Sequence, residues 1–196
     1  MPTLAGIGVY FCKNPRDLFS LTDLGIDIAK YTDKLSGKHL TLAAQVSSYC
    51  GRGKDICDVK FFYDSISALR ALKFDPYNHT FVIAASDALS NIAFIIDNLF
   101  RHKAVTYYTK PLGAAADTVR DSFDLYEKYH TFSAETLAFS LSKLCHTIAS
   151  IALSMLTFYS LYEGRENPAP LTTILAVSIY LGTKISAYIY SPPAAR

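Results

Sequence analysis

The residues of this chain that could do chemistry are few and scattered. Gly51–Lys54 resembles part of a phosphate-binding loop, but that motif ends in Ser or Thr after the lysine, and here Asp55 follows. Cys145 and His146 are adjacent on a predicted helix, where neighbouring side chains point about 100° apart, so they do not form a nucleophile–base pair. The sequence contains no GxSxG, HExxH, GxGxxG or paired-carboxylate signature. We therefore expect a protein that is not an enzyme.

The composition argues against metal and nucleic-acid sites as well. The four cysteines show no CxxC spacing and the histidines are scattered, so no zinc site is predicted. The net charge is +2 and no basic run is present, which argues against nucleic acid as a partner. We expect no cofactor, with phospholipid as the one small molecule that the protein would bind.

The C-terminal third consists of two long apolar segments. Residues 137–162 carry only Lys143 and His146 as titratable side chains, and residues 171–190 carry only Lys184. At about 1.5 Å per residue each helix would span roughly 30 Å, the thickness of a bilayer's hydrocarbon core. We predict an all-α integral membrane protein in which residues 131–196 form a transmembrane helical hairpin and a tail.

A third apolar segment, residues 81–100, has a narrow polar stripe. At 100° per residue Asp87, Asn91 and Asn98 fall within about 40° of one another, so we expect them to face other helices or a polar cavity. The sequence leaves open whether this helix crosses the membrane, lies on it or belongs to a core. We expect this helix, a linker at 104–116 and a charged helix at 117–129 to form a middle region, residues 76–130.

Residues 1–75 are predicted to be an amphipathic helical region. Residues 1–13 are expected to be irregular, and Asn14 followed by Pro15 predicts a helix start. Further breaks are expected at Gly37 and at Gly51–Lys54, which divide the region into helices at 14–35, 38–50 and 55–74. Apolar residues recur every three or four positions and predict a buried face on the first helix: Leu18, Leu21, Leu24, Ile28 and Tyr31.

Cationic side chains beside the apolar helices are the candidate contacts to lipid headgroups or partner subunits. Lysine can extend its charged end to the membrane surface while its stem stays in apolar surroundings. A proton or ion path through Asp87, Lys143 or His146 is the alternative interpretation of the polar groups within the apolar helices. The predicted lipid- or partner-binding residues are Arg52, Lys54, Arg101, Lys103, Lys143 and Lys184.

Residues 55–105 resemble the peroxin-eleven family of peroxisome-proliferation membrane proteins. The likeness lies in residues 61–72 (FFYDSISALRAL), followed by an aromatic residue, two aliphatic residues and Asp-Asn-Leu at 94–99, a basic turn at 101–103 and a C-terminal membrane segment. The resemblance implies an all-helical organellar membrane protein that elongates membranes through amphipathic helices, without a cofactor and without catalysis. The short N-terminal region departs from the family pattern and leaves room for a relative used as a structural subunit.

Three functions are consistent with the sequence. The first is a non-catalytic, lipid-contacting accessory subunit of a large organellar membrane complex, with the mitochondrial inner membrane (a respiratory or ATP synthase complex) as the favoured location and other membrane subunits as partners. The second is a peroxisomal or glycosomal membrane-elongation factor, as the resemblance implies. The third is a small transporter or membrane enzyme.

Overall fold

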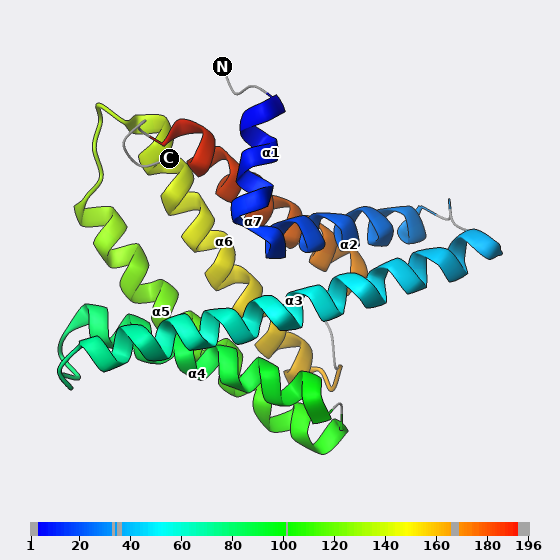
Figure 1. The fold of residues 1–196 in the computed structure, drawn as a ribbon, viewed down its shortest axis with the longest axis horizontal. Helices are drawn as coiled ribbons and strands as arrows, with labels where there is room; N and C mark the ends of the chain where they lie inside the picture. The colour runs from blue at the N-terminus through cyan, green and yellow to red at the C-terminus, as the bar shows by residue number, and fades with distance from the viewer. Residues whose placement is uncertain (1–3, 33, 35–36, 101, 166–168, 192–196) are drawn as a thin grey trace. The chain divides into compact units, whose positions relative to one another are not determined.

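The chain is built of helices. A computed structural model describes residues 4–32, 34, 37–100, 102–165 and 169–191, and it contains no strand among them (Figure 1). The helices are α1 (Leu4–Lys13), α2 (Pro15–Tyr31), α3 (Lys38–Ala71), α4 (His79–Phe100), α5 (Lys103–His130), α6 (Leu137–Tyr162) and α7 (Pro170–Tyr190). The prediction of an all-α chain is therefore confirmed for the described residues.

The helices fall into two compact units, each described here by itself. The first unit comprises residues 1–54, 132–146 and 169–196, and the second comprises residues 55–131 and 147–168. The helices α3 and α6 each contribute residues to both units.

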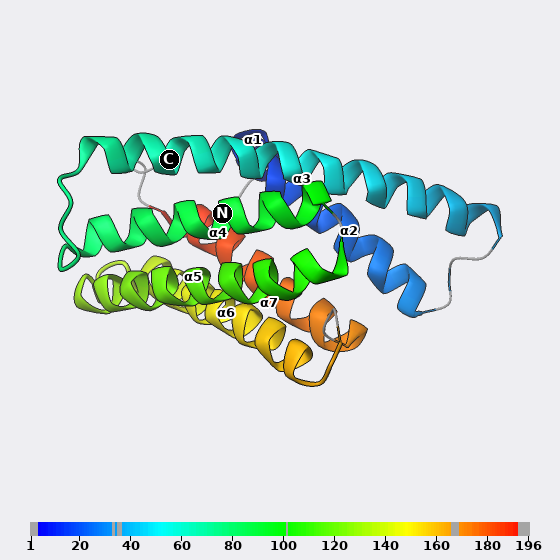
Figure 2. The ribbon, with the colours of Figure 1, turned by 90° about the horizontal axis from the view of Figure 1, so that it is seen from below.

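In the second unit α4 lies between the C-terminal half of α3 and α5 (Figure 2). The helices α4 and α5 approach closely at Gly113, where an added Cβ would lie 3.1 Å from the ring of Phe94. The small side chains of Ala88, Ala93 and Ala114 are buried in this unit. Small residues let helix backbones approach closely, so α4 and α5 pack as a tight antiparallel pair.

In the first unit α7 packs against α2 and α1. The buried apolar core is small and consists of Leu24, Ile174 and Leu181. Tyr10 of α1 is buried, and its ring lies 5.0 Å from that of Tyr188 of α7.

Three segments that the sequence predicted to be non-helical are helical. Residues 4–13 form α1 rather than an irregular segment, Gly51–Lys54 lies inside the continuous helix α3, and the linker predicted at 104–116 is part of α5, with Pro111 inside the helix. Tertiary contacts explain two of them. An added Cβ on Gly53 would lie 2.5 Å from the ring of Phe19, so this glycine is needed for α2 to approach α3, and Gly113 has the same role between α5 and α4.

The predicted buried face of α2 is also wrong. Leu24 is buried, whereas Leu18, Leu21, Ile28 and Tyr31 are exposed. The helix ends at Tyr31 rather than at residue 35. The apolar residues recur at helical spacing, but no other part of the described chain covers them.

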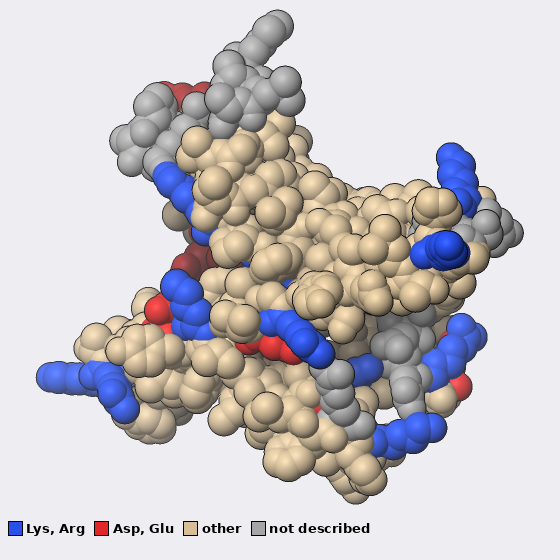
Figure 3. Space-filling model, turned by 45° about the vertical axis from the view of Figure 1, so that its right-hand side comes forward, with Lys and Arg blue, Asp and Glu red and all other residues tan. Residues whose placement is uncertain are grey.

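Three helices are long and apolar enough to cross a membrane. They are α4, α6 and α7, of 22, 26 and 21 residues. At most 22% of the residues in the most apolar 18-residue stretch of each helix are buried. The predicted apolar helices at 137–162 and 171–190 are thus present, and α4 joins them. Figure 3 shows a face on which most of the visible surface belongs to residues other than Lys, Arg, Asp and Glu.

Candidate functional site

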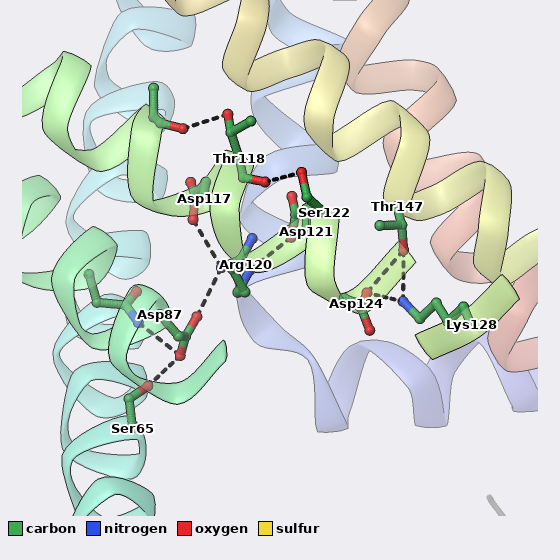
Figure 4. Close-up of polar contacts among 12 residues, drawn as sticks. Ser65, Asp87, Asp117, Thr118, Arg120, Asp121, Ser122, Asp124, Lys128 and Thr147 are labelled. Atoms are coloured by element: carbon green, nitrogen blue, oxygen red, sulfur yellow. Dashed lines mark hydrogen bonds and ion pairs between the residues drawn. The ribbon is translucent and has the colours of Figure 1, made fainter. Parts of the chain in front are cut away.

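The strongest polar constellation of the second unit is centred on Arg120 of α5 (Figure 4). Its guanidinium Nη1 donates to Asp87 Oδ1 of α4 at 2.9 Å and to Asp117 Oδ1 at 3.0 Å, and its Nε donates to Asp121 Oδ1 at 2.8 Å. A guanidinium is planar and always charged, so it can hold several carboxylates in fixed directions. Arg120 therefore joins α5 to α4 through its contact with Asp87, while Asp117 and Asp121 of its own helix hold the guanidinium.

Asp87 extends this network to the third helix of the unit. It accepts hydrogen bonds from the Ser65 hydroxyl of α3 and, at 3.3 Å, from the Asn91 amide of α4. A single carboxylate thus receives donors from three helices, counting Arg120. This makes Asp87 the residue that links α3, α4 and α5.

A second group of polar residues continues the network towards α6. Lys128 pairs with Asp124 one turn earlier on α5, and it donates to the buried Thr147 hydroxyl at 2.8 Å. Thr147 in turn donates to Asp124 at 3.0 Å. Asp124 and Lys128 of α5 are therefore paired with each other and with the hydroxyl of a neighbouring apolar helix.

A pocket of about 450 Å³ opens beside these residues. Its polar lining consists of Asp64, Ser65, Thr80, Asp87, Arg120 and Asp124, drawn from α3, α4 and α5. Among the described residues no group of three or more His, Cys, Asp or Glu side chains could hold a metal ion. The carboxylates that line the pocket at Asp87 and Asp124 are held by Arg120, Lys128 and hydroxyl donors, an arrangement that fixes helices in place.

The first unit contains a smaller ion-pair site. Lys184 of α7 pairs with the buried Asp17 of α2, with Nζ at 3.0 Å from both carboxylate oxygens. Tyr10 of α1 donates its hydroxyl to the same carboxylate. Burial raises the pKa of Tyr10 well above its ordinary value, and the hydrogen bond to the Asp17 carboxylate raises it further. Asp17 is thus the common acceptor for α1 and α7.

The predicted polar stripe of α4 is divided among several partners. Asp87 bonds α3 and α5 as described, and Asn91 bonds Asp87 within the same helix. Asn98 donates to Asp55 of α3 at 2.6 Å. The neighbouring Asp97, which lies off the stripe, accepts from Thr109 of α5 at 3.1 Å.

The predicted cationic contacts lie in different surroundings. Lys54 pairs with Asp23 of α2, which also accepts from Ser47 at 2.9 Å. Arg52 is exposed on α3, and Lys103 is exposed at the start of α5. Arg101 lies outside the described residues.

The cations of the apolar helices have aromatic neighbours. Lys143 lies over the Phe139 ring at 5.1 Å, and Lys184 lies over the Tyr180 ring at 5.7 Å. The His146 ring lies 4.5 Å from the same tyrosine, and its Nδ1 is 3.3 Å from the Tyr180 carbonyl oxygen.

Sequence reasoning missed Arg120 and Asp17 as the centres of the two sites. Neither belongs to a motif, and their partners lie 33 and 167 residues away in the chain. One signal was available, because an apolar helix that carries Asp87 needs a cationic or hydroxyl partner on another helix.

Comparison with protein-family models, with curated proteins and with solved structures finds no match for this chain.

Proposed function

We propose that this protein is a non-catalytic membrane subunit whose apolar helices contact lipid and other membrane proteins within a larger complex. The observation that carries the proposal is the exposure of its large apolar side chains. Leu24, Ile174, Leu181 and Tyr10 are the large apolar residues that are buried among the described residues, whereas Leu141, Ile148, Met155, Leu175 and Ile179 of α6 and α7 are exposed.

Water cannot be the natural surroundings of such a surface. Soluble monomers rarely expose continuous apolar surface of this extent, and large patches mark membrane or protein contacts. Each unit also contains internal ion pairs, centred on Arg120 in one and on Asp17 in the other. An apolar exterior with internal ion pairs suits a protein whose helices contact lipid and other membrane proteins.

An organellar membrane, with the mitochondrial inner membrane favoured, is the location we propose. The alternative is the membrane-elongating role that the peroxin-eleven resemblance implies. The exposed apolar stripe of α2, with Leu18, Leu21 and Ile28, favours this alternative, since such a stripe could lie in a membrane surface.

The first test is extraction of the native membrane. The protein should stay in the pellet after alkaline carbonate treatment and enter solution with mild detergent. Release by carbonate would contradict membrane insertion, and a known soluble and a known integral protein of the same membrane serve as controls.

The second test is native electrophoresis of the detergent extract, followed by mass spectrometry of the band. Migration at fixed stoichiometry with a much larger complex supports the subunit proposal and identifies the organelle. Migration as a monomer or small homo-oligomer would overturn it, and tubulation of anionic vesicles by the full chain would then test membrane elongation.

A further inference from the structure

Helix α5 has its charged and apolar faces reversed relative to a helix of a soluble protein. Its charged residues between Tyr108 and Tyr129 are all buried or half-buried: Lys110, Asp117, Arg120, Asp121, Asp124, Glu127 and Lys128. The exposed residues over the same range are all uncharged and form what we call the outer stripe: Tyr108, Leu112, Ala115, Val119, Ser122, Tyr126 and Tyr129. In water the reverse arrangement is expected.

The outer stripe is regular and well exposed. Its members follow one another at intervals of four and three residues, which places them on one face of the helix. Tyr108 is 72% exposed, Leu112 46% and Val119 43%, so no other described part of the chain covers this face.

The order of residues along the stripe matches a bilayer cross-section. Tyrosine stands at both ends, and small or aliphatic side chains other than Ser122 fill the middle. Tyr108 and Tyr126 are separated by about 27 Å along the helix axis and Tyr108 and Tyr129 by about 32 Å, at 1.5 Å per residue. A hydrocarbon core is about 30 Å thick, and tyrosine is enriched at its two surfaces.

The pairing of α5 with α4 is an independent reason to place α5 in the membrane. The helix α4 is long and apolar enough to cross a membrane, and α5 begins three residues after α4 ends. At the far end, His79 of α4 lies 5.1 Å from the Phe123 ring and 5.5 Å from the Tyr126 ring of α5. Because the two antiparallel helices occupy the same length, a bilayer crossed by α4 must also enclose α5.

We propose that α5 is a fourth membrane-spanning helix, with its outer stripe against lipid acyl chains and its charges turned to α3, α4 and α6. This inference rests on the proposed membrane function. It extends that function to a helix whose many charged residues are not typical of a membrane-spanning helix. The network of Arg120 with Asp87, Asp117 and Asp121 then lies near mid-depth. Arg120 pairs there with one oxygen of each of the three carboxylates, as charged groups within a membrane need partners, while Asp121 Oδ2 is buried without a hydrogen-bond partner.

The chain contains no tryptophan, which makes a single introduced Trp a clean probe. The full-length variants Val119→Trp and Tyr126→Trp are reconstituted in phosphatidylcholine vesicles. Lipids brominated near the chain end should quench Val119→Trp more than lipids brominated near the headgroup, and Tyr126→Trp should show the opposite order. Aqueous iodide should quench Val119→Trp several-fold less than it does in unfolded protein.

Ile179→Trp, on the exposed face of α7, is the matched control. Iodide quenching of Val119→Trp with lipid quenching of Ile179→Trp would overturn the proposal for α5 alone. Iodide quenching of both would overturn the membrane function itself. Protection of Val119→Trp from both lipid and iodide would show a protein partner on the stripe and overturn lipid as its occupant. Leu112→Trp probes the same stripe if Val119→Trp fails to fold.

Discussion

At the scale of single residues, Asp87 is the carboxylate that receives donors from α3, α4 and α5. It receives donors from Ser65, Asn91 and Arg120, so Asp87→Asn removes the negative charge beside a half-buried guanidinium and one of the two acceptor oxygens. We expect Asp87→Asn to lower the free energy of unfolding by about 1–3 kcal/mol, the contribution of hydrogen bonds to charged groups. Thermal unfolding in detergent should show this as a drop of several degrees.

Asp64→Asn is the control for this prediction. Asp64 lines the same pocket, but its partner Lys60 and its own side chain are exposed, at 71% and 54%. Exposed pairs of this kind contribute little, so Asp64→Asn should unfold within about 0.5 kcal/mol of the original protein. Equal effects of the two substitutions would contradict the role given to Asp87.

Tyr10 gives the chain a dependence on alkaline pH. Its pKa is higher in the folded state than in the unfolded state, because of burial and the Asp17 carboxylate. The neutral form therefore stabilises the fold fully below about pH 10, the unfolded pKa, and this contribution is lost as pH rises above it. Tyr10→Phe should be less stable than the original protein at pH 8, and the difference should narrow above pH 10.

Unfolding midpoints of both proteins at a series of pH values measure this effect. The other tyrosines are the same in both proteins, so the difference between the two curves isolates Tyr10. A difference that stays constant from neutral to strongly alkaline pH would show that the hydroxyl is not held against Asp17.

At the scale of helices, the two glycines in the middle of α3 should behave differently. An added Cβ on Gly51 meets nothing within 4 Å, whereas one on Gly53 would lie 2.5 Å from the Phe19 ring. Alanine is favoured over glycine inside a helix by about 0.5–1 kcal/mol, so Gly51→Ala should stabilise the protein by that amount.

Gly53→Ala should lose that gain, because the Phe19 ring must move away from α3. The two variants are compared by thermal unfolding under the same conditions, and Gly53→Ala should unfold at the lower temperature. If both variants are stabilised equally, α2 does not pack on α3 at this glycine. Phe19→Leu combined with Gly53→Ala should recover part of the loss.

At the scale of the whole chain, proteolysis in detergent should distinguish connections from helices. Lys73, between α3 and α4, and Arg165, between α6 and α7, are exposed outside helices. Arg120 is half-buried in α5 and held by three carboxylates. Brief trypsin treatment should therefore cut after Lys73 and Arg165 first, because a protease needs a locally unfolded segment.

Mass spectrometry of the fragments measures the order of cleavage. We expect the ion pairs of Arg120 to keep α5 folded. Early cleavage after Arg120 would instead show that α5 unfolds locally more easily than the connections between helices. Heat-unfolded protein, in which all three sites are equally open, provides the reference.

The sequence by itself determined where the apolar helices lie. Residues 137–162 and 171–190 are apolar for so long that helix formation needs no distant partner, and the structure has them at Leu137–Tyr162 and Pro170–Tyr190. The start of α2 at Pro15 was equally readable, since the chemistry of Asn-Pro is local.

Only the tertiary structure decided which glycines break helices and which charges meet. Gly53 and Gly113 read as breaks because local propensity disfavours glycine, yet each lies inside a helix where a ring of another helix passes too close for a Cβ. The pairing of Asp87 with Arg120 and the outward stripe of α5 depend on how helices face one another. That choice is made by contacts between residues far apart in the chain, which local sequence pattern alone does not specify.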